Sequence, residues 1–307
     1  MPDRNRPLTI GLVNNMQEAA FKATEGQFVL LLEEASRAES ISIRLPLLTL
    51  PHIAETTHRL PSRYSSVEAF RNTQLDGLIV TGREPLAPNL RKEPYWRSFT
   101  QLVEWARDQT HSTIWSCLAA HAAVLHMDGI ARRKREDKHF GVFECAHVTD
   151  HALLAGLPPN HAVPHSRWNG LAEHDLTTHG YSILTRTADA EVDGFVKQER
   201  SLFVFFQGHP EYETDTLMRE YKRDVARYLR RESDIYPQLP YNYFDSDSTE
   251  ALAALGEQAI SHRSKEQLRS VATVLEEAQI SDTWRAASVQ IYRNWLRYLR
   301  ACSTAHE

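Results

Sequence analysis

The chain has 307 residues, of which 42% are hydrophobic and 24% are charged, and its formal net charge at pH 7 is -5. This balance is that of a folded soluble protein, and the length suffices for one large α/β domain or two ordinary ones. The negative charge argues against a nucleic-acid-binding protein with a broad basic face, and no apolar run approaches the roughly 18 residues that a membrane span needs. We therefore expect neither nucleic acid nor a membrane among its partners.

The three cysteines, Cys117, Cys145 and Cys302, are widely spaced and odd in number. They cannot form a complete disulfide framework, and no CxxC pair suggests a metal site, so a reducing compartment fits best. The first residues, Met1–Pro7, are polar and lead into no apolar segment of the kind found in secretory signals. We expect a cytoplasmic protein.

Within the first 130 residues, short apolar runs alternate with amphipathic stretches. The apolar runs are rich in β-branched residues and predict strands, while apolar residues at helical spacing predict helices. Thr24 and Gln27 have capping-box spacing and predict the start of the first helix. The strands are expected at 8–13, 41–47, 78–80 and 113–116, and the helices at 24–35, 99–106 and 118–125.

This alternation predicts an α/β fold with a mostly parallel sheet and helices on both of its faces. Such sheets bind ligands at the carboxyl ends of their strands. Thr81, Gly82 and Cys117 directly follow two of the predicted strands. We therefore expect these residues to face one crevice.

The second half of the chain is less regular. Prolines interrupt it at 158, 159 and 164, and residues 165–167 are expected in a loop or at a strand edge. A strand is expected at 202–206, an amphipathic helix at 217–229 and a break at Asp245–Thr249, after which the chain is helical. We divide the chain into one domain over residues 1–245 and a helical C-terminal segment over 246–307 that packs on it.

Cys117 stands between a predicted strand and a predicted helix, which is the position of a nucleophile elbow. A thiol at a helix N-terminus is acidified by the helix dipole, and the free N–H groups there can hold an oxyanion. The flanking residues are not the usual elbow glycines, and free cysteines are often small buried hydrophobic residues. Both interpretations are open from this segment alone.

His209 and Glu211 follow another predicted strand and are separated by Pro210. In an extended backbone their side chains share a face, so the carboxylate can orient the imidazole as in a Cys–His–acid arrangement. The alternative is a histidine in a turn beside an exposed glutamate. No HExxH, GxGxxG or GxxxxGK[ST] motif occurs, so we expect no metal site and no bound cofactor.

Several segments, taken in order along the chain, resemble the homoserine O-succinyltransferase family, a family of homoserine O-acyltransferases. The resemblance runs from about residue 8 to residue 244, with a weaker tail at 284–285 and 294–296. Any one piece is short, but all of them in this order make a specific signal. The pieces are DGLIVTG (76–82), PYW (94–96), STIWSC (112–117), GVFE (141–144), PHSR (164–167), GHPEY (208–212), RD (223–224) and PYNYF (240–244).

The resemblance implies a flavodoxin-like fold similar to that of class I glutamine amidotransferases, and a ping-pong reaction of methionine biosynthesis. In that reaction Cys117 takes an acyl group from an acyl-CoA cosubstrate, succinyl-CoA or acetyl-CoA. The hydroxyl of L-homoserine then receives it, with His209 as the base and Glu211 as its orienting carboxylate. The backbone N–H of Leu118 is implied as one oxyanion donor, and the loop after Gly82 as the source of another.

The family's active-site lysine and serine match Lys138 and Ser166, and its arginine for the substrate carboxylate matches Arg223. A guanidinium suits that task because it pairs with a carboxylate in two places. The small-molecule partners implied are therefore an acyl-CoA and L-homoserine. The helical C-terminal segment is a candidate contact for a homodimer.

The chain also departs from the family pattern. Family members read Thr-Gly-Ala-Pro where this chain has the residues 81–85, TGREP. A few residues later, a glutamate favours acetyl-CoA and a glycine favours succinyl-CoA, and here the position is Leu86, or Ala87 with a one-residue shift. Neither residue is a glutamate, and this absence favours succinyl-CoA as the donor. A leucine at this position, however, crowds the longer succinyl group. His121 replaces the family's glutamine, and 249–280 resembles an insertion.

Three alternatives stay open from the sequence. The first is an O-acetyltransferase, the second is an enzyme that acts on serine in place of homoserine, and the third is a Cys–His–Glu hydrolase of the amidotransferase type. The leading interpretation is a homoserine O-acyltransferase, with succinyl-CoA as the expected donor.

Overall fold

The structure is a computed structural model that describes residues 6–56, 61–70, 73–280 and 282–305. Within these residues a nine-stranded sheet forms the centre of the molecule, in the order β4-β3-β1-β5-β6-β12-β11-β9 with β2 beside β1. The strands are β1 (Leu8–Val13), β2 (Ile43–Arg44), β3 (Leu47–Thr49), β4 (Tyr64–Ser66), β5 (Leu75–Val80), β6 (Thr110–Ser116), β9 (Ser182–Ile183), β11 (Gly194–Gln198) and β12 (Leu202–Phe206). Among the described strands of this sheet, only β11 forms antiparallel pairs, with β12 and with β9, so the sheet is mostly parallel, as predicted.

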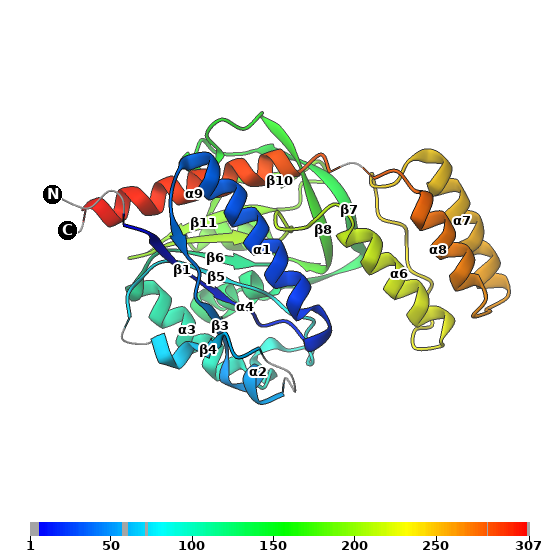
Figure 1. Cartoon of the computed structure of the whole chain (residues 1–307), viewed down its shortest axis with the longest axis horizontal. Helices are drawn as coiled ribbons and strands as arrows, with labels where there is room; N and C mark the ends of the chain where they lie inside the picture. Colours follow the sequence, from blue (N-terminus) through cyan, green and yellow to red (C-terminus); the bar gives the residue numbers. More distant parts are fainter. Residues whose placement is uncertain (1–5, 57–60, 71–72, 281, 306–307) are drawn as a thin grey trace.

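Helices cover both faces of this sheet (Figure 1). On one face lie α1 (Glu18–Glu39) and α9 (Arg285–Ala305), and on the other lie α3 (Trp96–Gln109) and α4 (Leu118–Asp128). The alternation of side chains along β12 shows how both faces are filled, because Val204 packs with the α1–α9 layer while Phe203 and Phe205 pack with the α3–α4 layer. A strand buried on both faces reads as a continuous apolar run, which is why 202–206 was predictable.

The C-terminal helix α9 lies flat against the sheet. A Cβ on Gly77 of β5 would stand 2.7 Å from Leu299 Cδ1 and 2.9 Å from Trp295 Cη2, so the helix approaches where the strand has no side chain. The indole N–H of Trp295 donates to Ser112 Oγ at 2.9 Å. The last helix of the chain is therefore part of the core that supports β5 and β6.

A second, three-stranded antiparallel sheet consists of β10 (Thr185–Thr187), β7 (Arg133–His147) and β8 (Asn160–Gly170). The sequence did not predict β7, because its charged residues conceal any alternation between 133 and 138. Residues 165–167, expected in a loop or at a strand edge, lie inside β8, since residues 160–167 pair continuously with β7. The short helical elements of the described residues are α2 (Pro51–Thr56), η1 (Val67–Phe70) and η2 (Leu90–Lys92) among the strands of the central sheet, and η3 (Ala152–Leu154) and α5 (Glu173–Thr178) later in the chain.

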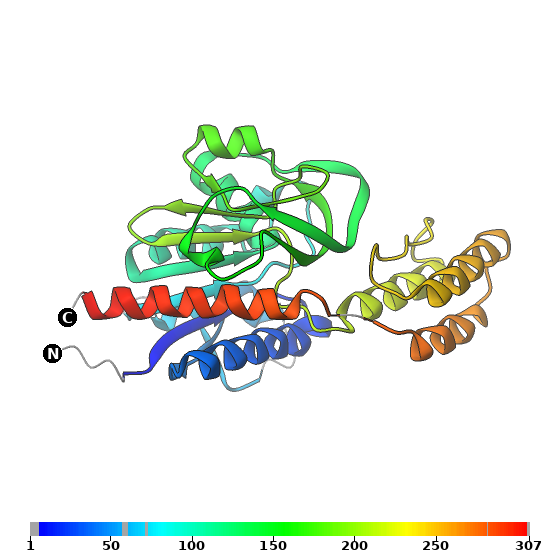
Figure 2. The same ribbon diagram turned by 90° about the horizontal axis from the view of Figure 1, so that it is seen from above.

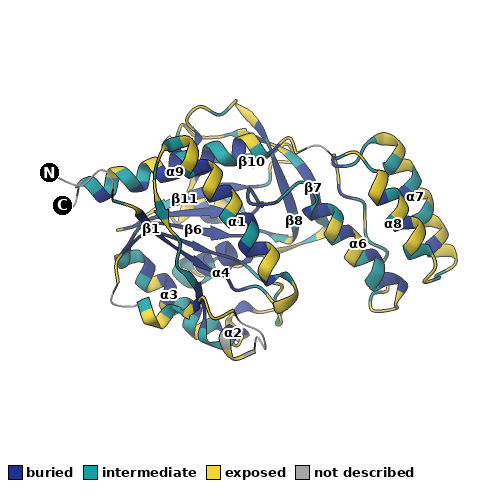
Figure 3. Ribbon diagram, in the orientation of Figure 1, coloured by how far each residue is buried: buried dark blue, intermediate teal, exposed yellow. Residues whose placement is uncertain are grey.

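Three further helices extend the molecule away from both sheets (Figures 1 and 2). They are α6 (Thr216–Leu229), α7 (Ser246–Ser261) and α8 (Gln267–Glu277), and a cluster with Leu217, Tyr221 and Val271 joins them. The burial pattern in Figure 3 shows the buried residues of the hairpin α7–α8 on its inner side. The expected division of the chain at residue 245 stays a prediction.

Three local predictions need correction. Helix α1 begins at Glu18, not near Thr24, and Gln27 is instead buried and donates to Thr216 Oγ1 at 2.9 Å. The strand expected at 41–47 is divided into β2 and β3 around Pro46, which has no N–H for a sheet. Asp245 accepts from Ser248 N at 2.9 Å and caps α7, so the polar stretch after it starts a helix and is no break.

Among the described residues, no helix is both long enough and apolar enough to cross a membrane. The N-terminus and the C-terminus of the fold meet at one buried carboxylate, Asp76 on β5. It accepts hydrogen bonds from Arg6 Nη2 at 2.7 Å, Thr9 N at 2.7 Å and Ser303 Oγ at 2.6 Å. Burial alone raises the pKa of Asp76, but these hydrogen bonds and the charge of Arg6 outweigh it and hold the pKa below its ordinary value.

We expect Asp76→Asn to lower the free energy of unfolding by about 2 kcal/mol at pH 7, the scale of hydrogen bonds to a buried charge. The folded-state pKa of Asp76 is lowered. Its contribution to the free energy of unfolding is therefore complete above the unfolded-state pKa of about 3.9 and is lost as the pH falls through the folded-state pKa. Urea unfolding from pH 7 to pH 3 measures this difference. Asp234→Asn, at an exposed aspartate, is the matched control, and a gap between wild type and Asp76→Asn that widens below pH 4 contradicts the assignment.

Candidate active site

Cys117 lies at the junction between β6 and α4 with a backbone φ of +52° and ψ of -113°. This conformation is strained for a residue with a Cβ. It is held because Cys117 N donates to Phe206 O at 2.7 Å on the neighbouring strand β12, and Cys117 O accepts from Ala120 N at 3.0 Å. The thiol is partly exposed at a sharp strand-to-helix turn, which is the geometry of a nucleophile elbow without its usual glycines.

The loop that follows β5 comes against the start of α4. A Cβ on Gly82 would stand 2.7 Å from Leu118 N and 3.1 Å from Ser116 O, so only glycine allows this approach. Leu118 N is the first amide of α4 and has no partner within the helix. The two strand ends are therefore side by side, as expected from the parallel topology, and the first amide of α4 lies where they meet.

His209 and Glu211 are brought together by a turn and not by the extended backbone that the sequence suggested. Tyr212 N donates to His209 O at 3.1 Å, and Pro210 occupies the second position of the turn, where its fixed φ is favourable. His209 Nδ1 lies 2.8 Å from Glu211 Oε1, which also accepts from Ser116 Oγ at 3.2 Å. Both side chains are buried, so the histidine is oriented by a carboxylate shielded from water.

Burial lowers the pKa of His209, but the negative charge of Cys117, its hydrogen bond with that residue and the carboxylate of Glu211 outweigh it and raise the pKa well above the ordinary value. The imidazolium form therefore persists through neutral pH and is lost only as the pH rises through the folded-state value. The arrangement is an imidazolium beside the Cys117 sulfur, supported by an acid, and it suits nucleophilic catalysis.

The turn that carries His209 is clamped on its inner side. His209 N donates to Pro164 O at 2.8 Å, and Gly208 N donates to Asp193 Oδ1 at 3.1 Å. A Cβ on Gly208 would stand 2.6 Å from Val163 Cγ1, so the backbone of the turn rests directly on β8. Contact with the second sheet therefore fixes the position of the His209 imidazole relative to β12.

Cys145, His165 and Asp193 are the one described group whose ligand atoms, all within 4.8 Å of one another, have metal-binding chemistry. His165 Nδ1 accepts from Arg167 Nε at 3.3 Å, so the ring proton is on Nε2 and faces Asp193 Oδ1 at 3.4 Å. Burial raises the pKa values of Cys145 and Asp193, which disfavours the charged forms that bind metal ions. These residues fit a buried structural network better than a metal site.

Lys138, Ser166 and Arg223 come from β7, β8 and α6 and meet around Glu220. Ser166 Oγ donates to Glu220 Oε2 at 2.5 Å, Lys138 Nζ lies 3.8 Å from the same oxygen, and Arg223 Nη2 lies 4.0 Å from it. The structure thus brings together all three residues that the resemblance implied for substrate binding. It also adds Asp224, which lies 3.4 Å from Lys138 Nζ and 2.8 Å from Arg223 Nε.

Glu220 was not identified from the sequence. Its only signal is its spacing, because residues 220, 223 and 224 share one face of α6. Its other oxygen accepts from Tyr212 OH at 2.6 Å, and the Tyr212 ring stacks on His209 at 4.2 Å between centroids. Tyr212 therefore connects the charged cluster with the Cys117–His209 pair.

The two residues expected to affect the acyl group lie in the loop after β5. The Leu86 side chain is 59% exposed, so it fills no enclosed space in this structure. Ala87 N donates to Glu93 Oε1 at 2.7 Å, which ties the loop to a buried carboxylate. His121, which replaces the family's glutamine, is buried and keeps a neutral ring, because burial lowers its pKa to about 3, and its Nε2 lies 2.8 Å from Gln207 Oε1.

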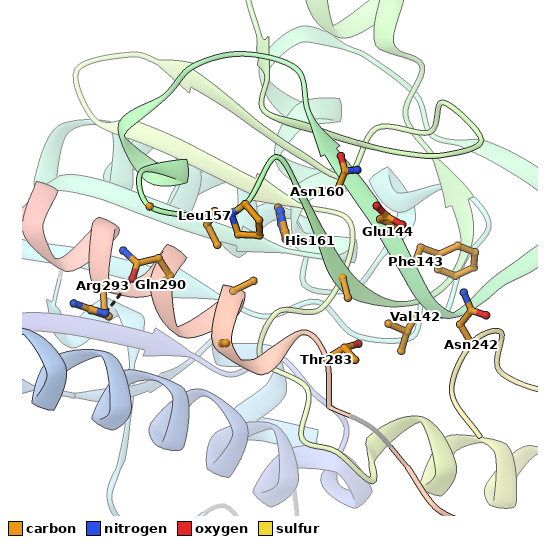
Figure 4. A pocket seen from close by; sticks show the side chains of 15 residues that line it. Val142, Phe143, Glu144, Leu157, Asn160, His161, Asn242, Thr283, Gln290 and Arg293 are labelled. Atoms are coloured by element: carbon orange, nitrogen blue, oxygen red, sulfur yellow. Dashed lines mark hydrogen bonds between the residues drawn. The ribbon is translucent and has the colours of Figure 1, made fainter. Parts of the chain in front are cut away.

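A cavity of about 790 Å³ lies elsewhere, between the β7–β8 hairpin and the start of α9 (Figure 4). Its lining includes Glu144, His161, Gln290 and Arg293, and none of the predicted site residues contributes to it. The cavity is therefore separate from the thiol and does not define the candidate active site.

Comparison with known proteins agrees with this geometry. The sequence profile of the family described as Homoserine O-succinyltransferase matches residues 2–306. The chain is 45% identical over 301 residues to a homoserine O-succinyltransferase of Rhodopseudomonas palustris, covering 96% of this chain and 90% of the relative. It is 43% identical over 297 residues to one of Bradyrhizobium japonicum, covering 95% and 90%.

Solved structures show the fold. A glutamine amidotransferase from Methylobacillus flagellatus is similar with a TM-score of 0.53 at 14% identity, covering 95% of this chain and 94% of that chain. One from Thermotoga maritima has a TM-score of 0.50 at 16% identity, covering 89% and 97%. The expected fold of the class I glutamine amidotransferase type, with its mostly parallel sheet and C-terminal helices, is confirmed.

We expect Glu211→Gln to slow the alkylation of Cys117 by iodoacetamide at pH 7 by about tenfold. This is the change in a protonation equilibrium that corresponds to a fall of one unit in the pKa of His209. The amide removes a negative charge that raises the pKa of His209, so the imidazolium is lost at lower pH and supports less thiolate. Timed alkylation from pH 6 to pH 8, followed by mass spectrometry, measures the rate.

Glu213→Gln makes the same change of charge two residues away and should leave the alkylation rate unaltered. Equal rates in Glu211→Gln and the wild type across this range are incompatible with an orienting role for Glu211.

Proposed function

This chain belongs to the homoserine O-succinyltransferase family, and from that membership we propose that Cys117, His209 and Glu211 transfer a succinyl group from succinyl-CoA to the hydroxyl of L-homoserine. The observation that supports this most directly is the strained elbow at Cys117, hydrogen-bonded to an imidazole whose pKa is raised by a buried carboxylate. A structural cysteine needs neither feature.

In the first half-reaction the Cys117 thiolate attacks the thioester carbonyl carbon of succinyl-CoA. The carbonyl oxygen becomes an oxyanion, which the Leu118 N–H and an N–H of the loop after Gly82 stabilise by hydrogen bonds. When the tetrahedral intermediate collapses, the bond to the CoA sulfur breaks, and the imidazolium of His209 gives its proton to that sulfur. The products are the Cys117 thioester, neutral His209 and free CoA.

In the second half-reaction neutral His209 accepts the proton of the homoserine hydroxyl while the oxygen attacks the Cys117 thioester. The hydrogen bond from Nδ1 to Glu211 leaves Nε2 as the accepting nitrogen. The carbon–sulfur bond then breaks, O-succinylhomoserine leaves, and the thiolate–imidazolium pair is restored. The proton and electron pairs balance over the cycle without any bound cofactor.

The charged cluster beside this pair suits a zwitterionic acceptor. Arg223 and Lys138 supply positive charge for the homoserine carboxylate, while Glu220 and Asp224 attract its ammonium group. Arg223 has a 49% exposed side chain, so its guanidinium can turn from Asp224 towards a ligand. Tyr212, which contacts both Glu220 and His209, places this cluster next to the attacking imidazole.

The covalent mechanism predicts that succinyl-CoA alone leaves one succinyl group on Cys117, since without an acceptor the thioester has no partner. Intact-mass spectrometry detects the adduct, and added L-homoserine should discharge it. Cys117→Ser should show no adduct, while Cys145→Ser, at a buried cysteine of the second sheet, should be acylated like the wild type.

An unchanged mass with every acyl-CoA tested argues against covalent catalysis. Rapid turnover of acyl-CoA to free acid without homoserine assigns the site to a hydrolase instead.

We expect Arg223→Ala to raise the homoserine KM by about tenfold to a hundredfold, the range of a charge-assisted hydrogen bond, and to leave the acylation of Cys117 unchanged. Steady-state kinetics with varied homoserine and the mass assay separate the two effects. Arg219→Ala removes a guanidinium one turn earlier on α6, where it pairs with Asp215 at 3.0 Å, and serves as the control. A wild-type homoserine KM in Arg223→Ala removes the carboxylate-binding role.

A further inference from the structure

The loop over residues 82–93 leaves β5 at the thiol and runs along α4. Gly82 starts it against Leu118 N, and Arg91 Nη2 donates to Leu125 O at 3.3 Å further along the helix. Ala87 N is held by Glu93 Oε1 at 2.7 Å, and the Glu93 carboxylate is 4% exposed. The loop therefore forms one wall beside the elbow and buries a carboxylate in it.

Two arginines meet beside this wall. The Arg83 guanidinium carbon lies 5.4 Å from the centre of the Tyr95 ring, and Arg132, which follows α4, donates from Nη2 to Pro88 O at 3.3 Å. Tyr95 has both arginines and Glu93 as electrostatic neighbours. The side chains of a loop and of the segment after α4 thus bring two positive charges to one buried aromatic ring.

These arginines are incompletely compensated in the part of the chain that the structure describes. The buried Nε of Arg83 has no hydrogen-bond partner there, and neither has Oε2 of Glu93. Apart from Tyr95, the groups that attract Arg132 are Glu93 and the Cys117 sulfur. Two guanidinium groups therefore lie near one carboxylate at Tyr95, and Arg132 also has the Cys117 sulfur as a neighbour.

Acylation supplies no new charge for these arginines. The thiolate becomes a neutral thioester while His209 gives up its proton, so Glu93 is still the carboxylate beside Tyr95 and the two guanidinium groups. A succinyl group places a carboxylate two methylene groups beyond the thioester carbonyl, whereas an acetyl group ends in a methyl. A dicarboxylic acyl group thus brings a negative charge to two guanidinium groups that lie near one carboxylate, in a site where burial makes an unpaired cation costly.

We propose that Arg83 and Arg132 bind the distal carboxylate of the acyl group on Cys117 and thereby select a dicarboxylic acyl donor. This inference rests on the proposed function, because it assigns the acyl end of the same site. Arginine suits the role because its fork of N–H groups pairs with a carboxylate in two places. The proposal also assigns a function to Arg83, which stands in the segment where this chain departs from the family pattern.

The test compares succinyl-CoA with butyryl-CoA, which has the same four-carbon chain and ends in a methyl group. The second-order rate of Cys117 acylation, without homoserine, is measured by quenching and intact mass for the wild type, Arg83→Met and Arg132→Met. We expect each variant to lower the succinyl rate by about tenfold to a hundredfold, as the loss of a charge-assisted hydrogen bond does, and to leave the butyryl rate within about twofold. Methionine keeps an unbranched apolar stem, so packing on Tyr95 is largely retained.

Arg91→Ala removes a guanidinium from the exposed part of the same loop and should alter neither rate. The butyryl rate also reports whether each variant has kept its elbow intact, and the two arginines are tested separately, so one misfolded variant does not end the test. Equal losses with both donors assign the arginines to the phosphates of CoA and overturn the inference. So does a wild type that reacts equally fast with both donors, or a succinyl rate unchanged in both variants. A wild type that no acyl-CoA acylates refutes the proposed function itself.

Discussion

The backbone of Cys117 is the constraint on which the site depends. A positive φ at a residue with a Cβ persists only where the surroundings impose it, and here the hydrogen bond from Cys117 N to Phe206 O imposes it. The same bond aligns the ends of β6 and β12, and the turn with His209 and Glu211 follows β12 directly. The pairing that strains the elbow therefore also brings the imidazole to the sulfur.

Charge is compensated differently in the three parts of the site. Cys117 and Glu211 both act on the imidazole of His209 and raise its pKa, so these three groups support one another before any substrate binds. The cluster around Glu220 holds both signs and suits a ligand that also carries both. The arginines beside Tyr95 have a surplus of positive charge, which is the pattern of a site completed by an anion. These three patterns correspond to the nucleophile, the acceptor and the acyl end of the proposed reaction.

The additions to the central sheet carry the residues that we propose for binding the acceptor. Lys138 and Ser166 lie on the second sheet and Arg223 on α6, while the sheet itself, shared with the glutamine amidotransferases, carries the elbow. The segment after α8 also reaches the site, because Trp284 Nε1 donates to Tyr212 O at 2.9 Å and Tyr212 stacks on His209. The hairpin α7–α8 projects from the body (Figure 2), and Trp284, which lies between this hairpin and α9, contacts the turn at 209–212.

The sequence by itself determined the parallel sheet, the place of Cys117 at a strand end and the family, because buried strands and helix faces have local periodic signatures and the motifs occur in a fixed order. It did not reveal β7, the residues 165–167 within β8, the turn at 209–212 or Glu220. Their conformation depends on partners distant in the chain, such as the pairing of β7 with β8 and the contact of Ser166 with Glu220. Only the tertiary structure decided which charges are left unpaired, since compensation of a buried charge is a property of all the groups that fold around it and not of any segment alone.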